Sequence, residues 1–572
     1  MNFYRFQSIC TECGRPVPAA YVRKGGVVFL EKACPEHGTS RALASEDAEA
    51  FERWLAFTSV TVPPQVLLAE GQRTRFLEFH PEGQREKLLE SRPEKQLTDV
   101  VLKQQQNDPE CAEINIEILN TECPLHCGPC ENHLMTACCV LLNVTARCNQ
   151  HCPYCFAEAE QEAASRSQAE VKDVGDPSLT DVERWLERLV ELGEERKFNI
   201  QLSGGEPTVR DDLPDIIRLC KEKGFEYVQL NTNGRRLAEE STYAKLLKTA
   251  GLSTVFMQFD GVDDEVYIAL RGEPLLEIKK AAVRNCGAAG LPVSLVPTVL
   301  KSVNLSQTGA IIDFMLDHIS VVKGVHFQPA SFFGRRPDER NAGGDFDERV
   351  TMFAVMDDIE KQTGGRIRKA DLAPISTGHP LCCFCAAFIK EPDDGLRPLS
   401  SGGSCCENNG KEPMLRSLSS GGSCCDSNEK EPMLRPLASD GSCCENNEKQ
   451  PEQDPLEIIR RDRDFVMNKW NVSVPEDAPA GRIKEAAAAC IKSEDVPADT
   501  TGDNLSSRAD KAIMSFDEAI AMFKKNSFTI SGMAFMDETN LDAERLRRCR
   551  VQVFTEDERL VPFCGYYTRT AK

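Results

Sequence analysis

The sequence predicts an α/β protein whose central sheet of parallel strands curves into a partial (β/α)6 barrel. Apolar runs of strand length alternate with helical segments between residues 140 and 330, and strands separated by helices usually pair in parallel. Polar or glycine-rich motifs follow these strands, at the carboxyl ends where sites in parallel sheets lie. The expected strands are 140–146, 198–203, 226–231, 254–259, 293–299 and 325–330, and the expected helices are 178–194, 211–223, 240–250, 263–289 and 305–319.

The composition is that of a globular protein and excludes several classes of function. The chain has 572 residues, enough for several domains, and a net charge of −22, whereas nucleic-acid-binding proteins normally have a basic surface. It contains no apolar run long enough to cross a membrane and no signal peptide at its start. We therefore expect a cytoplasmic protein without a nucleic-acid partner or a membrane span. In a reducing cytoplasm its 26 cysteines indicate metal or redox chemistry.

A cysteine triplet follows the first expected strand. Cys148, Cys152 and Cys155 stand at Cys-x3-Cys-x2-Cys spacing, and three thiolates at this spacing can ligate three irons of a 4Fe–4S cluster, leaving the fourth iron open for a small molecule. The alternative is a structural zinc site. Zinc sites usually use two separated cysteine pairs, whereas this triplet has Tyr154 before its last cysteine, so the pattern favours the cluster.

A glycine-rich turn, GGEP at residues 204–207, follows the second expected strand. Its two glycines allow a ligand to approach the backbone, and its carbonyls and glutamate can face an ammonium group. Downstream of the cysteine triplet, this motif resembles the radical S-adenosylmethionine (SAM) superfamily over roughly residues 140–335. The resemblance implies that the three cysteines hold the cluster, whose open iron binds the amino and carboxylate groups of SAM. The residues expected to contact SAM are Tyr154, Gly204, Gly205, Glu206, Pro207, Asn231, Asn233 and Gln258.

Further motifs resemble one class within this superfamily. VQLNTNGRRLA, MQFDGVDDEVY, CPLHCGPCENH and CPEHG are similar to the class that includes archaeal tetraether lipid synthase and the methylases of methanopterin-type pterins. The resemblance implies more than one 4Fe–4S cluster and carbon–carbon bond formation or methylation at an unactivated carbon. It also implies a small-molecule or lipid substrate, and leaves contact with a membrane surface open. The expected electron donor is ferredoxin or flavodoxin.

Two ligand pairs flank an expected hairpin near the N-terminus. Cys10 and Cys13 form one pair, and Cys34 and His37 form the other. Two pairs across a hairpin suit a tetrahedral zinc ion or a mononuclear iron. We expect this metal to be structural, because so small a module buries little apolar surface.

Other cysteines suggest auxiliary clusters. Cys123, Cys127 and Cys130 repeat the Cys-x3-Cys-x2-Cys spacing upstream of the first triplet, but no glycine-rich strand end of their own follows. The resemblance also favours Cys549 and Cys564, which a hairpin over 550–554 and 560–563 joins, as ligands of an auxiliary cluster. One of Cys382, Cys383 and Cys385 would join them, and we expect Cys382. Packing in the core is the alternative for Cys549 and Cys564.

Three near-identical repeats of nineteen residues begin at Leu396, Leu415 and Leu434, and each carries a Cys-Cys pair. Their polar, glycine-rich composition cannot form a packed core, so we expect disorder, with either no role or one in binding soft metals. The predicted division is a metal-binding module (1–60), a helical connector with an auxiliary-cluster segment (61–135), the radical SAM core (136–390), the repeats (391–453), a helix and linker (454–515), and an auxiliary-cluster hairpin (516–572).

Three functions fit the sequence. The first is a radical SAM enzyme that makes carbon–carbon bonds or methylates a lipid or pterin. The second is a radical SAM peptide maturase, and the third is a non-catalytic metal or electron-transfer protein, which has no use for the GGEP turn at residues 204–207. No side chain is identifiable as a general acid or base.

Overall fold

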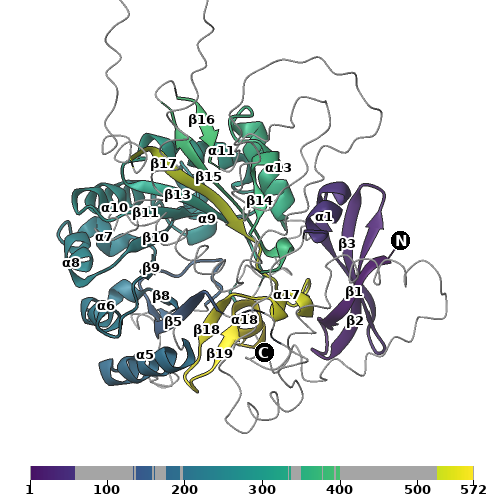
Figure 1. Cartoon of the computed structure of the whole chain (residues 1–572), viewed down its shortest axis with the longest axis horizontal. Helices are drawn as coiled ribbons and strands as arrows, with labels where there is room; N and C mark the ends of the chain where they lie inside the picture. The colour runs from purple at the N-terminus through teal and green to yellow at the C-terminus, as the bar shows by residue number, and fades with distance from the viewer. Residues whose placement is uncertain are drawn as a thin grey trace, which may run out of the picture.

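A computed structural model describes residues 2–57, 133–399 and 525–570, apart from 134, 136, 158–159, 162–174, 194–197, 333, 336–348, 376–377 and 392–393. Figure 1 shows a small N-terminal sheet beside a larger sheet, with the two helices of the C-terminal segment lying between them. Cys123, Cys127 and Cys130 lie outside the described residues, as do the three Cys-Cys pairs of the repeats.

The six expected strands are confirmed and lie side by side. Each pairs in parallel with the next, and the sheet has two open edges, as expected of a partial barrel. The strands are β5 (Cys139–Thr145), β8 (Asn199–Gly204), β9 (Val228–Thr232), β10 (Thr254–Gln258), β11 (Val293–Val296) and β13 (Val322–Pro329), with β12 (Thr298–Val299) beside the end of β13.

Helices cover the outer face of this sheet (Figure 1). The expectation of one helix over 263–289 is wrong, because Gly272 adopts a left-handed φ of 84° and ends α9. Two helices, α9 (Asp264–Arg271) and α10 (Leu276–Ala288), stand in its place. The other helices are α5 (Leu179–Gly193), α6 (Leu213–Glu222), α7 (Arg235–Glu239), α8 (Tyr243–Ala250), α11 (Thr308–Asp317) and α13 (Met352–Gln362), with 3-10 turns η3 (Pro207–Val209), η4 (Leu305–Gln307), η5 (Lys369–Asp371) and η6 (Pro380–Cys382).

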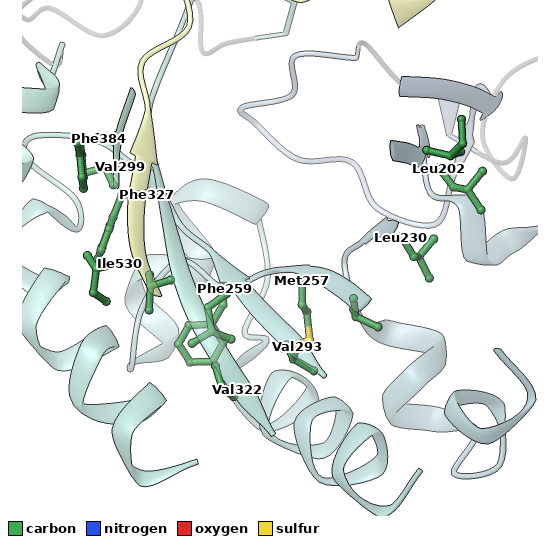
Figure 2. Packing of buried hydrophobic residues seen from close by; sticks show 14 of the residues in the cluster. Leu202, Leu230, Met257, Phe259, Val293, Val299, Val322, Phe327, Phe384 and Ile530 are labelled. Carbon is green, nitrogen blue, oxygen red and sulfur yellow. The ribbon is translucent and has the colours of Figure 1, made fainter. Parts of the chain in front are cut away.

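The hydrophobic core lies between the sheet and these helices. Figure 2 shows Leu202, Leu230, Met257, Val293 and other outward-facing strand residues in this layer, and all four are fully buried. Because successive strand residues point to opposite faces, the intervening residues of β8, β9, β10 and β13 face the barrel interior. The packing therefore determines which residues of each strand face the interior.

The C-terminal segment extends both edges of the parallel sheet. β17 (Ser527–Met533) pairs in parallel with β13, and β18 (Val551–Phe554) pairs in parallel with β5. The expected hairpin is confirmed, since β18 continues into β19 (Leu560–Pro562). β15 (Cys383–Lys390) pairs antiparallel with β17. The remaining elements here are β14 (Ala373–Pro374), β16 (Leu396–Pro398), α17 (Ala543–Arg547) and α18 (Phe563–Thr570).

The start of the first repeat is ordered, contrary to the expectation of disorder from residue 396. Leu396, Arg397 and Pro398 form β16, which pairs with the end of β15. Edge pairing supplies backbone hydrogen bonds that composition alone does not reveal.

The N-terminal module is an antiparallel sheet of β1 (Asn2–Ile9), β2 (Pro16–Lys24), β3 (Val27–Cys34) and β4 (Gly38–Ser45), followed by α1 (Ala48–Leu55). Gly25, with a φ of 65°, lies in the expected turn between β2 and β3. On α1, Phe51 and Trp54 pack their rings against Phe353 of α13. The module is thereby continuous with the hydrophobic core of the larger sheet.

Candidate active site

The cysteine triplet lies in a loop that leaves the carboxyl end of β5. Cys148 ends the short strand β6 (Arg147–Cys148), which pairs with β7 (Glu160–Gln161). The backbone N–H of Cys155 donates to the Arg335 carbonyl at 3.0 Å, and the backbone N–H of Arg335 donates to the Cys155 carbonyl at 2.8 Å. The Arg335 Nη1 also donates to the Cys152 carbonyl at 3.2 Å. These bonds tie the loop to the segment that follows β13.

Two of the three triplet thiols, those of Cys148 and Cys152, are buried. Burial raises the pKa of Cys148 to about 12, and the Glu206 carboxylate and the thiols of Cys152 and Cys155 act in the same direction. Burial likewise raises the pKa of Cys152, whereas Arg271 opposes that increase. As free thiols, Cys148 and Cys152 would stay protonated at neutral pH. They fit the ligands of a metal centre, because a bound metal ionises such thiols.

The GGEP turn packs directly on this loop. The backbone N–H of Gly205 donates to the Thr145 carbonyl at 2.8 Å, and that of Glu206 donates to the Arg147 carbonyl at 2.8 Å. A Cβ on Gly204 would lie 2.1 Å from the Thr145 oxygen, and one on Gly205 would lie 2.2 Å from the Arg147 oxygen. The close approach of two backbones, rather than turn flexibility alone, explains both glycines.

Glu206 is an internal anchor of the site. It is 2% exposed, and its carboxylate accepts hydrogen bonds from the N–H and hydroxyl of Thr208, the hydroxyl of Thr232 and the N–H of Asn233, at 2.6–3.1 Å. Burial raises the pKa of Glu206, although these hydrogen bonds oppose the increase. Four protein donors thus already occupy the carboxylate, which leaves the backbone of the turn as the surface facing a ligand.

The other residues expected to contact SAM lie at different depths. Asn233, beyond β9, donates through Nδ2 to Asn149 Oδ1 at 2.7 Å and so joins two loops of the site. The backbone carbonyl of Tyr154 accepts a hydrogen bond from Arg271 Nη1 at 3.1 Å. Gln258 lies at the end of β10, where it meets Lys279 and Arg271. Asn231 lies deeper, inside the barrel.

Two buried cations at the site were missed by the sequence reasoning. Arg271, the last residue of α9, interacts with the thiols of Cys152 and Cys155. Lys279 on α10 is completely buried and donates to the Asn233 carbonyl at 2.6 Å; burial lowers its pKa to about 8. Each lies on the apolar face of a helix expected from the sequence. A charged residue in such a position is the signal that could have identified both buried cations.

A second group of cysteines gathers where the C-terminal segment meets the sheet. Cys549 and Cys564 interact electrostatically with each other and with Cys382, and Arg545 Nε lies 3.4 Å from the Cys382 sulfur. Burial raises the pKa of Cys564 to about 12. Of the three candidates Cys382, Cys383 and Cys385, Cys382 is the one that interacts with both Cys549 and Cys564.

The N-terminal ligand pairs also converge. The Cys10, Cys13 and Cys34 sulfurs and a ring nitrogen of His37 all lie within 4.8 Å of one another. His37 Nδ1 is 3.6 Å from the Cys10 sulfur and 3.5 Å from the Cys34 sulfur. A hydrogen bond from the Cys13 backbone lowers the pKa of Cys10 to about 6, which favours the thiolate that a metal requires. Three thiols and an imidazole at these distances fit tetrahedral zinc.

Comparison with known proteins agrees with this geometry. Residues 142–315 match the family model of the radical SAM superfamily, and residues 3–46 match the HMPTM N-terminal zinc ribbon domain. The chain is similar to 7,8-dihydro-6-hydroxymethylpterin dimethyltransferase of Methanocaldococcus jannaschii, with 28% identity over 98% of this chain and 92% of the relative. It is 31% identical to a probable GTP 3',8-cyclase of Methanothermobacter marburgensis over 47% of this chain and 86% of that protein.

Among solved structures, SuiB of Streptococcus suis bound to its precursor peptide SuiA matches with a TM-score of 0.29 and 15% identity, covering 56% of this chain and 63% of that chain. Within the described parts of the chain, every helix is too short or too polar to traverse a lipid bilayer.

Proposed function

Because this chain belongs to the radical SAM superfamily, we propose that it is an enzyme that methylates a pterin at an unactivated carbon. The observation that carries this proposal is the similarity to a pterin dimethyltransferase over nearly the whole length of both chains. The match includes the zinc-ribbon module as well as the barrel, so it extends beyond what superfamily members share in general.

In this proposal, Cys148, Cys152 and Cys155 would hold a 4Fe–4S cluster, and the backbone of Gly204 and Gly205 would lie along SAM. When bound, such a cluster supplies one-electron cleavage of SAM to methionine and a 5′-deoxyadenosyl radical, which abstracts hydrogen from an unactivated carbon. Glu206 orients the turn by its bonds to Thr208 and Asn233.

The protein's remaining task is to keep water away from the reacting groups and to hold them in place. Arg271 holds the cysteine loop at the Tyr154 carbonyl, and Lys279 holds the loop after β9 at the Asn233 carbonyl. Phe156, next to the last triplet cysteine, packs on Phe563 and Tyr567 of α18, so the C-terminal helix lies against the loop, and Phe156 itself remains 38% exposed.

Auxiliary metal centres complete the proposed enzyme. Cys382, Cys549 and Cys564 would bind one auxiliary cluster, Cys123, Cys127 and Cys130 would contribute to another, and the Cys10, Cys13, Cys34 and His37 set would bind structural zinc. The reductant would be ferredoxin or flavodoxin.

Two alternatives are less well supported. A peptide maturase would also use auxiliary clusters, but the near-full-length relative is named for a pterin substrate. A lipid substrate would require a wholly apolar interior, whereas β8, β9 and β13 direct Gln201, Asn231 and His326 inward beside the apolar residues of β10 and β11.

The test uses the full chain with clusters reconstituted anaerobically. The enzyme, SAM and dithionite are incubated with 7,8-dihydro-6-hydroxymethylpterin carrying deuterium on its carbons, and 5′-deoxyadenosine is analysed by mass spectrometry. Deuterium in 5′-deoxyadenosine is expected, because the radical must take hydrogen from the substrate. This readout does not depend on the source of the methyl group.

Archaeal lipid extract and an unlabelled pterin serve as controls. If deuterium never reaches 5′-deoxyadenosine from the pterin, while lipid extract yields a product of changed mass, the pterin assignment is wrong.

A further inference from the structure

One layer of the barrel interior is partly exposed and is lined by uncharged side chains, three of them polar and two apolar. On strands β8, β9, β10, β11 and β13 the outward-facing residues are buried beneath helices (Figure 2). The inward-facing residues nearest the amino ends of β8, β9, β10 and β11 are also buried, whereas a layer of inward-facing residues closer to the carboxyl ends is only half-buried. These half-buried inward residues are Gln201, Asn231, Phe256, Val296 and His326. If side chains filled the interior, these residues would be as buried as their neighbours.

One wall of this interior presents two adjacent amides. Gln201 Nε2 donates to Asn231 Oδ1 at 2.8 Å, and Asn231 Nδ2 donates to Ser203 Oγ at 3.3 Å. The Gln201 Oε1 accepts from the Cys139 thiol at 3.2 Å. A side-chain amide offers two N–H donors and two acceptor lone pairs, so each amide retains one donor and one acceptor after these bonds.

The opposite wall presents an imidazole and a hydroxyl. His326 Nδ1 lies 2.9 Å from Ser531 Oγ, and these two residues are paired across β13 and β17. Burial lowers the pKa of His326 to about 4, so the ring is neutral at pH 7 and can donate or accept. On β10, the residue paired with Asn231 is Phe256, whose ring centroid lies 5.6 Å from that of His326.

We propose that this ring of side chains is the substrate-binding site, and that it recognises a flat, uncharged nitrogen heterocycle of the lactam type. Gln201 and Asn231 would form hydrogen bonds with the edge of the heterocycle that carries adjacent donors and acceptors. The His326–Ser531 pair would contact the opposite edge, and Phe256 lies between the amide pair and the His326–Ser531 pair. This inference rests on the proposed function, since it assigns to the pterin a place inside the barrel.

The chemistry of the wall excludes other ligand classes. The described inward residues at this level carry no lysine, arginine or carboxylate, so a phosphate or a charged peptide would lose its hydration without gaining a partner. An alkyl chain would leave the amides unpaired. A lactam ring supplies adjacent donors and acceptors, and its flat face suits the Phe256 ring.

The depth of the site fits the chemistry. Phe256 and Gln258 point to the same face of β10, and two strand residues span about 7 Å. A heterocycle on Phe256 would therefore lie one layer below Gln258, which borders the expected SAM site. Asn231, which the sequence reasoning grouped with the SAM contacts, belongs in this inference to the substrate.

The experiment compares wild type with Asn231→Asp, which keeps the shape of the side chain but replaces the N–H donor by an acceptor, and with His326→Phe. His318→Phe is the matched control, because it removes an imidazole that bonds the Phe314 carbonyl on α11, outside the barrel. Affinity for 7,8-dihydro-6-hydroxymethylpterin is measured by anaerobic equilibrium dialysis of the reconstituted enzyme with SAM present, and affinity for SAM is measured separately. Melting temperature and iron content check that each variant is folded.

We expect both interior variants to weaken pterin binding roughly ten- to hundredfold, the effect of losing one or two hydrogen bonds, with unchanged SAM affinity and a control like wild type. Unchanged pterin affinity in both variants would overturn the inference, and weaker SAM binding by Asn231→Asp would return Asn231 to the SAM site.

Guanosine is a second lactam probe. If wild type binds guanosine but not the pterin, and Asn231→Asp no longer binds guanosine, the pterin proposal is wrong but the inference of a lactam-binding site stands. If wild type binds neither compound, the pterin proposal and the inference are both wrong.

Discussion

Asp260 and Arg271 form a bidentate ion pair just beyond β10. Arg271 Nε donates to Asp260 Oδ2 and Arg271 Nη2 donates to Asp260 Oδ1, each at 2.8 Å. The Asp260 side chain is completely buried and that of Arg271 is 5% exposed. Arg271 further donates to the Tyr154 carbonyl and the Thr298 hydroxyl. The pair therefore fixes a positive charge beside the triplet thiols, at the level where the sheet meets the cysteine loop.

Replacing Arg271 by Met should lower the free energy of unfolding by about 3–5 kcal/mol, because it leaves the Asp260 carboxylate buried and uncompensated. Urea denaturation of the anaerobic protein measures this loss. The double variant Asp260→Asn with Arg271→Met should recover part of the loss, since no buried charge remains. A single variant that loses less than about 1 kcal/mol, or a double variant that recovers none of the loss, would contradict the prediction.

Substituting Cys148, Cys152 and Cys155 together by Ala should abolish SAM cleavage, because no ligand for the proposed cluster would remain. The measurement is 5′-deoxyadenosine formed with dithionite as reductant. Cys286→Ala is the control, because that thiol is buried in α10 away from the site. Cleavage at the wild-type rate in the triple variant would disprove the assignment.

The same triple variant should still contain iron and sulfide, since Cys382, Cys549 and Cys564 form a separate gathering of thiols. Elemental analysis after reconstitution gives the retained iron. Additional Ser substitutions at these three positions should lower the iron content again. Zero iron in the first variant would exclude auxiliary clusters.

The contact between the N-terminal module and α17 should make stability depend on pH. The Tyr21 hydroxyl donates to Asp542 Oδ2 at 2.9 Å, and burial raises the pKa of Asp542 to about 6. Because the folded-state pKa exceeds the ordinary value, the contribution of Asp542 to stability is complete at low pH and is lost as the pH rises through about 6.

The corresponding experiment compares wild type with Asp542→Asn, which keeps the cap of α17 and an acceptor for Tyr21. Between about pH 5 and about pH 7.5, wild type should lose about 1–2 kcal/mol of stability relative to the variant. A stability difference between the two proteins that does not change with pH, measured by chemical denaturation, would contradict the prediction.

Deleting residues 401–452 should leave iron content and SAM cleavage unchanged. The deletion begins after β16, whose pairing with β15 is kept, and loop length alters closure entropy only slightly. A matched deletion from residue 396 removes β16 and should lower the melting temperature. Loss of clusters from the shorter deletion would show that the Cys-Cys pairs are ligands, whereas intact SAM cleavage with lost turnover of the substrate would indicate a role in delivery.

The sequence by itself determined the features that depend on local spacing. The alternation of strands and helices predicted six parallel strands because hydrophobic periodicity reflects which face each residue buries. The Cys148, Cys152 and Cys155 triplet, the GGEP turn and the Cys10, Cys13, Cys34 and His37 pairs were recognisable because their members are close in sequence or flank one hairpin. The break at Gly272 was missed because a single glycine within a helical pattern is a weak signal.

Tertiary structure alone decided which distant residues share a site. β17 and β18 join opposite edges of the sheet from segments more than 180 residues beyond their partners β13 and β5, and this pairing brings Cys549 and Cys564 to Cys382. Only the strand registers place Asn231 across from Phe256 and His326 beside Ser531. The physical reason is that such contacts depend on chain closure and on packing against the whole core, which no local pattern of residues contains.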